Sequence, residues 1–177
     1  MVAFIIAQIV LAFIYSIGLE WFLHKYILHG LGKNKRSVLS FHYHDHHRNT
    51  RTNDFRDPAY ERLTNFTLKN GSGKEIAVLT MLILLHTPLL LLAPWAFLAL
   101  FACSVHYFVA HTFCHKFPEW GRRNFPWHYA HHMAPNQESN WGVRFDWIDK
   151  LLGTREYYVD TERELRDIKR RAKRKSQ

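Results

Sequence analysis

Long apolar stretches alternate with polar, basic ones along the chain. Val2–Leu19 is eighteen residues long and carries no charged side chain, a length typical of a transmembrane helix. Ile76–His115 is forty residues long and contains no Asp, Glu, Lys or Arg. As a single helix it would measure about 60 Å, twice the roughly 30 Å apolar core of a bilayer. Because Pro88 and Pro94 lie near its middle, this stretch is predicted to form two spans joined by a tight turn.

The pattern therefore predicts an all-α, integral-membrane helical protein. Three transmembrane helices are expected, at about 2–23, 76–93 and 95–112, and a fourth short or re-entrant segment is the alternative. Residues 1–160 are expected to form a single membrane domain with a histidine-rich helical cap on the cytosolic side. Residues 161–177 are expected to form a basic cytosolic tail.

The charges fix the expected orientation. The 177 residues include 24 Lys and Arg against 15 Asp and Glu, a net charge of +9, yet residues 1–24 and 76–115 contain no Lys or Arg. Since basic residues collect on the cytosolic side, we expect the N-terminus outside or in the lumen and both basic regions in the cytosol. The membrane would be a bacterial inner membrane or the endoplasmic reticulum. No nucleic-acid-binding motif accompanies the charge, so nucleic acid is not an expected partner.

Histidine is the most unusual feature of the composition. Twelve of the thirteen histidines lie in two windows, His24–His47 and His106–His132, which the predicted topology brings to one face of the membrane. On a helix, the H-x3-H and H-x2-H-H spacings put their rings on one side, as a shared metal site requires. The H-x4-H spacing of His24 and His29 separates two rings by about 140°. It therefore requires a local bulge, a helix end or two different metals.

The patterned histidines are predicted to bind metal. Imidazole suits zinc, iron, copper and nickel, and ten imidazoles are too many for one ion but fit two. An isolated histidine such as His86 is interpreted as an ordinary core residue. His44 and His106 are additional candidates, and the choice between His42 and His44 in the second motif stays open. The predicted ligands are His24, His29, His42, His46, His47, His111, His115, His128, His131 and His132.

These motifs resemble those of the fatty acid hydroxylase/sterol desaturase superfamily of integral-membrane di-iron enzymes. Their order along the chain is also similar. Asn140-Trp141-Gly142, followed by the stretch from Trp147 to Thr154, resembles the closing segment of that family. Two positions depart from the family pattern: Tyr43 stands where the second motif usually begins with histidine, and Ile148 interrupts the closing Trp-Asp pair.

The resemblance implies an O2-dependent non-haem di-iron hydroxylase that attacks a C–H bond of a lipid, fatty acyl or related. A desaturase or a sterol or carotenoid hydroxylase of the same superfamily is the alternative. The implied cofactor is a pair of iron ions, which zinc can replace in a purified sample. A zinc-dependent hydrolase and a membrane metal-transport or storage protein are the competing classes. Transport is disfavoured because only His86 lies deep in a predicted span.

Electrons for such a reaction must come from outside the chain, which has neither a dinucleotide fingerprint nor a cysteine cluster. We expect a ferredoxin or a small haem protein with its reductase, attracted to the basic face.

Metal-bound histidines usually donate their second N–H to a carboxylate or a carbonyl, which suggests partners among nearby acidic residues. The candidates are Glu20, Asp45, Asp146 and Asp149. Six aromatic residues are candidates either for lining an acyl channel or for packing in the core: Phe22, Phe108, Phe113, Trp127, Trp141 and Trp147.

Overall fold

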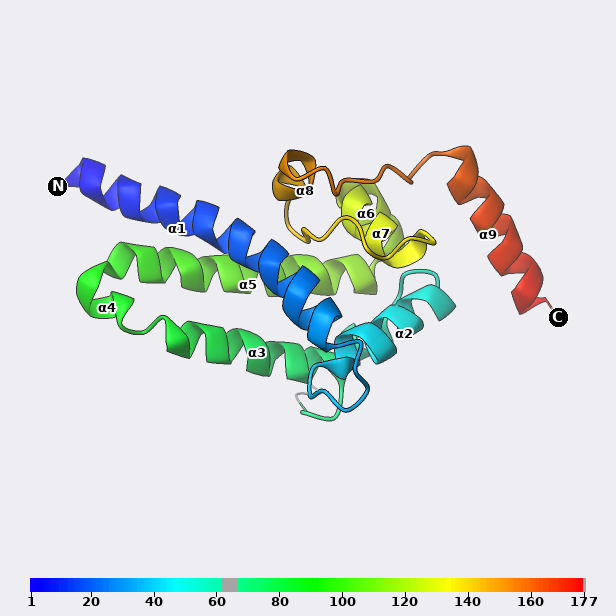
Figure 1. Cartoon of the computed structure of the whole chain (residues 1–177), viewed down its shortest axis with the longest axis horizontal. Coiled ribbons are helices and arrows are strands. Elements are labelled where there is room, and N and C mark those ends of the chain that lie inside the picture. The colour runs from blue at the N-terminus through cyan, green and yellow to red at the C-terminus, as the bar shows by residue number, and fades with distance from the viewer. Residues whose placement is uncertain (62–66, 177) are drawn as a thin grey trace.

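Three long helices lie side by side in the computed structural model and form a bundle (Figure 1). They are α1 (Val2–Phe22), α3 (Gly71–Leu85) and α5 (Pro94–Lys116), and α5 contacts both of the others. The structure describes residues 1–61 and 67–176, and these contain helices and turns but no strand. The prediction of an all-α fold is confirmed.

The bundle turns at the short helix α4 (Leu89–Leu92), which joins α3 to α5 (Figure 1). α3 begins at an N-cap, where the side chain of Asn70 accepts the N–H of Gly73 at 2.8 Å. It ends at Leu85, three residues before Pro88, because proline lacks an N–H and forces the preceding residue out of the helical region. Pro94 then begins α5, where its missing N–H costs no hydrogen bond.

The expected second span, 76–93, is therefore not one continuous helix. α3 has 15 residues and rises about 22 Å, which is shorter than the roughly 30 Å apolar core of a bilayer. The turn also starts at His86, earlier than the Pro94-Trp95 position expected from the sequence.

Within the described residues, two helical stretches are long and apolar enough to cross a membrane, Val2–Leu31 and Pro94–Lys116. Large apolar side chains of all three bundle helices point outward, which suits contact with lipid better than contact with water. Among them are Ile6, Leu11, Ile14, Met81, Leu84, Leu85, Leu98 and Phe101, each more than half exposed. These helices indicate a membrane protein.

Most of the remaining elements gather at the end of the bundle opposite α4, whereas α8 lies beside α1 (Figure 1). The π-helix η1 (Leu23–Leu31) continues α1 directly. The others are η2 (Phe41–His46), α2 (His47–Thr52), η3 (Pro58–Tyr60), α6 (Pro118–Asn124), α7 (Pro126–Met133) and α8 (Trp147–Leu151). The basic tail forms α9 (Glu162–Lys175), which is capped by Thr161 and tied to α6 by an ion pair between Arg122 and Glu164 at 2.8 Å.

Candidate metal centre

Two compact groups of buried histidines lie at the end of the bundle opposite α4. Within each group, one ring nitrogen from every residue lies within 4.8 Å of the others. The first group is His24, His29, His42, His47 and His131, and the second group is His46, His111, His115 and His132. His128 lies beside the second group, with its Nε2 atom 3.0 Å from that of His115. The structure thus brings all ten predicted ligands together and draws each group from both histidine windows.

π-Helical backbone places four histidines of the first group. In an α-helix, residues five apart lie about 140° apart around the axis, so His24 and His29 would not share a face. The chain instead forms the π-helix η1, whose i→i+5 hydrogen bonds stack residues five apart. His42 and His47 have the same spacing: His42 lies within the π-helix η2, and His47 directly follows it. Of the three explanations open for H-x4-H, the structure contains the local bulge.

The helices α5 and α7 supply the other members. His111 and His115 lie four residues apart on α5 and both belong to the second group. On α7, His131 belongs to the first group and His132 to the second. α7 therefore lies between the two groups, and its position determines where one histidine of each group lies.

Main-chain carbonyls fix the tautomer of three rings. The Nδ1 atoms of His24, His131 and His115 lie 2.6, 2.7 and 2.9 Å from the carbonyl oxygens of Trp141, Ser139 and Phe55, respectively. A carbonyl oxygen only accepts hydrogen bonds, so each of these Nδ1 atoms carries the hydrogen. Each neutral ring then presents the lone pair of its Nε2 atom to the other histidines.

In the first group, ring nitrogens approach one another as ligands of a single ion would. The Nε2 atoms of His24 and His42 are 3.0 Å apart. The Nε2 atom of His131 lies 3.1 Å from that of His29 and 3.2 Å from that of His47. Two nitrogens bound about 2.1 Å from one ion at a right angle lie about 3.0 Å apart. A cation between these lone pairs would replace their repulsion by coordination.

The second group contains buried nitrogens that lack partners. Among the described residues, the Nε2 atoms of His46, His111 and His132 are buried and make no hydrogen bond. Leaving such an atom unpaired costs about 1–3 kcal/mol, and a bound ion would give each nitrogen a partner. The chemistry of both groups therefore fits two metal ions.

Two carboxylates contact the second group, and neither was expected from the sequence. The Oδ2 atom of Asp57 lies 2.7 Å from Nδ1 of His46, and the Oε1 atom of Glu75 lies 2.8 Å from Nδ1 of His111. Both side chains are buried. Glu75 is the last charged residue before the forty-residue apolar stretch, where an unpaired charge would be costly. This position, directly before the apolar stretch, is the sequence feature that could have identified Glu75 as a candidate.

The four carboxylates proposed from the sequence have other partners. None of them contacts a histidine ring in the part of the chain that the structure describes. Glu20 pairs with Arg144 at 2.6 Å, Asp146 with Arg155 at 3.0 Å, and Asp45 with Arg48 at 3.6 Å. The prediction that they orient histidines directly is wrong, because arginines lie within reach of three of them.

Asp149 acts through the main chain of the closing segment. Its carboxylate accepts the N–H groups of Trp141 and Gly142 at 2.9 and 2.8 Å. These bonds hold the Trp141 carbonyl against the ring of His24. Position 142 requires glycine, since a Cβ there would overlap the carbonyl of Phe145. The closing segment thus orients one ring of the first group.

Burial keeps the imidazoles neutral. Loss of hydration lowers the pKa of His47, His131 and His132 well below its ordinary value, and neighbouring imidazoles lower it further. For Asp57, burial alone would raise the pKa, but the hydrogen bonds donated by His46, by the main-chain N–H of Ala59 and by Asn49 outweigh burial and hold that pKa below its ordinary value. Neutral imidazole is the form that binds metal ions.

Besides His128, which lies next to the second group, three histidines lie outside both groups. The Nε2 atom of His44 lies 2.9 Å from the carbonyl oxygen of Lys33, so the structure places His42, not His44, in the first group. His106 is exposed and its ring contacts that of Phe145. His86 lies near the far end of the bundle.

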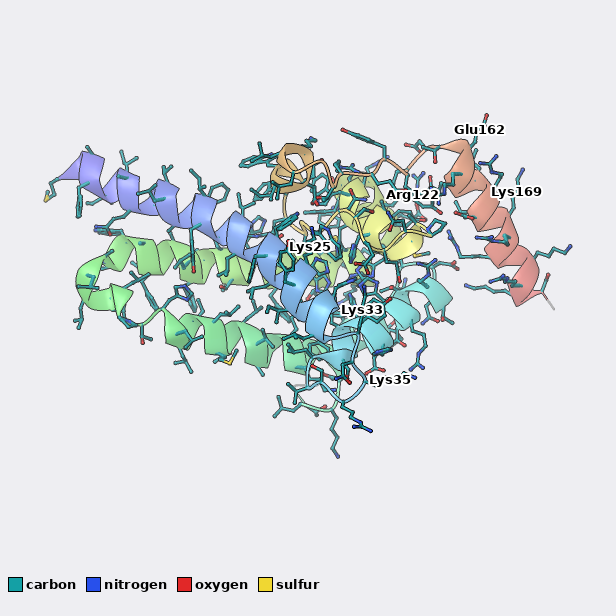
Figure 2. The ribbon with its side chains drawn as sticks, in the orientation of Figure 1. Lys25, Lys33, Lys35, Arg122, Glu162 and Lys169 are labelled. Carbon is teal, nitrogen blue, oxygen red and sulfur yellow. The ribbon has the colours of Figure 1, made fainter. Side chains whose placement is uncertain are left out.

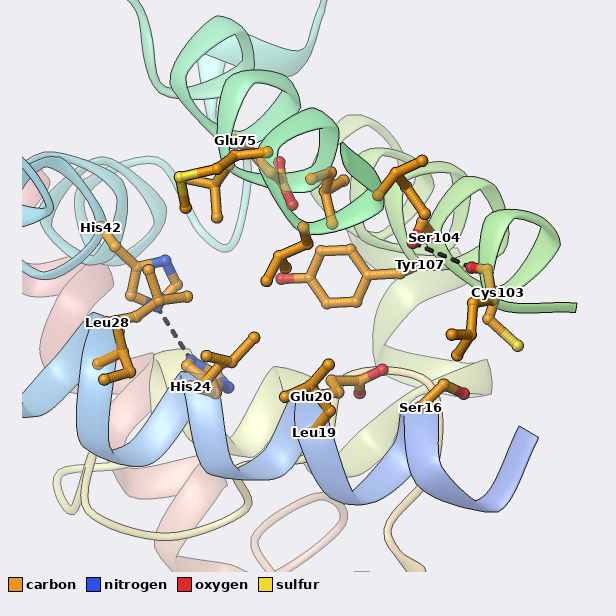
Figure 3. Close-up of a pocket in the computed structure, with 18 of the residues that line it drawn as sticks. Ser16, Leu19, Glu20, His24, Leu28, His42, Glu75, Cys103, Ser104 and Tyr107 are labelled. Carbon is orange, nitrogen blue, oxygen red and sulfur yellow. Dashed lines mark hydrogen bonds between the residues drawn. The ribbon is translucent and has the colours of Figure 1, made fainter. Parts of the chain in front are cut away.

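A cavity of about 180 Å³ leads away from the first group, between α1, α3 and α5 (Figure 3). His24 and His42 lie at one end of it, and Glu75 lies on its wall. Met81 also lines the cavity and is 53% exposed, so the cavity reaches the outer apolar surface of the bundle. Most of the other lining side chains are apolar, among them Leu19, Leu23, Ile27, Val78, Leu79, Leu82 and Leu100.

The aromatic residues of the cavity differ from those proposed from the sequence. Its rings come from Phe41, Tyr60 and Tyr107, and none of the six aromatic candidates lines it. Trp141 packs instead on the first histidine group, with its ring 4.8 Å from that of His29.

Comparison with known proteins yields one match. The model of the fatty acid hydroxylase family matches residues 9–154, which include both histidine windows and the closing segment. No curated protein and no solved structure matches the chain. The family is one of metal-dependent, membrane-associated oxidoreductases, in agreement with the buried histidine groups and the apolar helices.

Proposed function

The chain belongs to the fatty acid hydroxylase family, and on that premise we propose that it is an O2-dependent, non-haem di-iron hydroxylase of lipids. The observation that carries the proposal is the division of the buried histidines into two adjacent groups, each suited to one ion. When bound, a pair of irons supplies the O2 activation and C–H attack that no side chain can perform. The protein supplies ligands, orientation and a dry site.

The histidines would hold the two ions with little rearrangement. Carbonyl and carboxylate partners already fix the rings of His24, His46 and His131, so the Nε2 atoms of these rings face their groups before an ion binds. Asp57 and Glu75 add negative charge beside the second group, which favours a cation there. Both groups are buried, and this burial excludes water from the reaction.

The cavity described above is the proposed lipid site. Its apolar side chains would solvate an acyl or related chain, and its end at His24 and His42 would bring one carbon next to the first group. Met81, which lines the cavity, is also exposed on the surface that lipid would cover. A substrate could therefore enter from the bilayer without crossing water.

The orientation in the membrane is also proposed. α1, α5 and the segment formed by α3 and α4 would cross the bilayer, with the N-terminus outside or in the lumen. The histidine groups and the C-terminal helix α9 would lie in the cytosol. The absence of Lys and Arg from residues 1–24 and 76–115 supports this arrangement.

Mass spectrometry of lipids from a producing host tests the function. Cells that express the protein with iron should accumulate a lipid that has gained one oxygen atom. Cells that express the His132→Ala variant should not accumulate it. A lipid that has lost two hydrogens would instead identify a desaturase. Unchanged lipids in several hosts, despite an iron-loaded protein, would contradict both activities.

A bulky side chain in the cavity should block the reaction. In the Leu82→Trp variant the indole would occupy the space proposed for the lipid. The lipid carbon that is normally attacked would be displaced from the first group, and hydroxylation should be about a hundredfold slower. The matched control is Leu84→Trp, two residues along α3, because Leu84 is 62% exposed and does not line the cavity. Equal activities of the two variants, at equal iron content, would show that the lipid binds elsewhere.

A further inference from the structure

A second pocket opens at the surface beside the first histidine group. Three of its lining residues are cations, Lys35, Arg48 and Arg51, and none is a carboxylate. The other lining residues are Tyr43, His44, His47, Thr52 and Gln137. We call this site the basic pocket.

The positive charge of the basic pocket is only weakly neutralised. Arg48 has a carboxylate at 3.6 Å, that of Asp45, but both side chains are more than half exposed, and such pairs gain little. Arg51 donates to the main-chain carbonyls of His132 and Ala134, at 3.3 and 2.9 Å. Among the described residues it forms no ion pair with a carboxylate. The pocket therefore presents a positive potential to an approaching partner.

The floor of the basic pocket belongs to the metal centre. His47 lines the pocket, and its Nδ1 atom lies 3.0 Å from Nε2 of Gln137, which also lines it. The Nε2 atom of the same ring lies 3.0 Å from that of His29, inside the first group. One imidazole therefore separates the surface from the first group.

The basic pocket and the lipid cavity reach the first histidine group at different histidines. The cavity ends at His24 and His42, whereas the pocket ends at His47. The cavity is apolar and reaches the surface that lipid would cover, while the pocket is charged and open. Lys33 and Lys35 lie beyond the end of α1, at the end of the bundle opposite α4 (Figure 2). The pocket thus suits a partner that arrives through water.

We propose that the basic pocket is the docking site of an acidic one-electron carrier protein, with His47 as the point where the electron enters the first group. This inference rests on the proposed function, because a hydroxylase needs reduction. One lipid C–H bond, one O2, two electrons and two protons give one alcohol and one water. Each docking event oxidises the carrier by one electron and reduces the centre by one, so two events complete a turnover.

The position of the pocket favours a carrier protein over a lipid headgroup as the occupant. The chain carries a net charge of +9, and complementary charge speeds the association of an acidic protein. A headgroup would gain nothing from the contact with His47, whereas an electron carrier requires a short path to the metal. The carrier also needs an aqueous approach, which the open pocket provides.

The experiment uses a reduced, acidic [2Fe–2S] ferredoxin and the iron-loaded protein in detergent. In the variant that combines Lys35→Glu with Arg48→Glu, the second-order rate constant of reduction should fall about tenfold or more at low salt. At about 1 M salt the difference should vanish, because the Debye length shrinks to about 3 Å. Arg51 is left intact since its guanidinium also holds main-chain carbonyls.

The matched control is Lys169→Glu on α9, an exposed cation far from Lys35 (Figure 2). It should leave the rate of reduction by ferredoxin nearly unchanged. Reduction by a small photoreduced flavin should be the same in every variant. A double variant that ferredoxin reduces as fast as the native protein, or a Lys169→Glu variant that is equally slowed, would overturn the proposal.

Two further measurements separate the docking site from the function. The affinity of ferredoxin for the zinc-loaded protein tests docking without any redox step, and the double variant should bind at least about tenfold more weakly. If the double variant instead loses affinity only for vesicles of anionic lipid, the pocket binds headgroups and the docking proposal is wrong. If the flavin cannot reduce the native iron-loaded protein, the proposed function fails while the ferredoxin affinity still decides docking.

Discussion

Replacing His131 with alanine is expected to abolish hydroxylation and to remove the ion of the first group. The Nε2 atom of His131 lies 3.1 Å from that of His29 and 3.2 Å from that of His47, so the three nitrogens would share one ion. Alanine leaves a gap on α7 that no neighbouring nitrogen can fill. The ion of the second group should remain, because its ligands come from other residues. Elemental analysis of the purified variant and lipid mass spectrometry measure the two effects.

The control for this variant is His106→Ala. His106 is exposed and belongs to neither group, so its removal should preserve both ions and full activity. The mirror experiment is His132→Ala, which should spare the first ion and remove the second. Turnover in the His131→Ala variant, or the loss of both ions when His106 is changed, would contradict the assignment of ligands.

The Glu75→Gln variant should lower activity by about 10–100-fold while the protein stays folded. Glu75 lies 2.8 Å from Nδ1 of His111 and accepts the hydroxyl of Tyr60 at 2.6 Å. Glutamine keeps the size of the side chain but removes the charge that favours the hydrogen on Nδ1 and the lone pair on Nε2. The variant should therefore bind the second ion more weakly, and the Mössbauer spectrum of the iron should change.

The Tyr60→Phe variant separates the charge of Glu75 from its packing. It removes one hydrogen bond to Glu75 but keeps the carboxylate beside His111, so activity should fall less than in Glu75→Gln. A parallel change, Asp57→Asn, should resemble Glu75→Gln because Asp57 holds His46 in the same way. If Glu75→Gln leaves the spectrum and the metal affinity unchanged, Glu75 has only a structural role.

The sequence predicted the helices of the bundle well, since their signal is local. An apolar run of bilayer length and a proline-induced turn are visible in the order of residues alone. The break after Leu85 was not expected, because which of Pro88 and Pro94 would set the turn depends on packing between α3 and α5. The count of spans consequently stays a proposal.

The pattern of histidines predicted which side chains gather but not how they divide. His131 and His132 are adjacent in the sequence, and adjacent helical residues point about 100° apart, so they reach different groups. That division depends on where α7 lies relative to η1 and α5. The H-x4-H spacing left a bulge, a helix end or two metals open, and the π-helix η1 is the first of these.

The sequence did not predict the carboxylate partners of the histidines, because residues that meet only in the tertiary structure have no fixed spacing along the chain. Asp57 and Glu75 lie 11 and 36 residues from the histidines that they touch, as the numbering shows. Glu20 lies one turn from His24, yet it turns to Arg144. Proximity along a helix therefore did not predict which carboxylate contacts a histidine. The tertiary arrangement of charges determines those contacts.

We propose that the two buried histidine groups hold two redox-active irons. The decisive experiment is metal analysis of the iron-replete, detergent-purified protein, combined with protein quantification and Mössbauer spectroscopy. Two irons per chain, coupled to each other, are expected in the native protein, and one iron per chain is expected in the His131→Ala variant. A native protein that holds one iron or none under the same conditions would show that the two groups do not hold an iron pair.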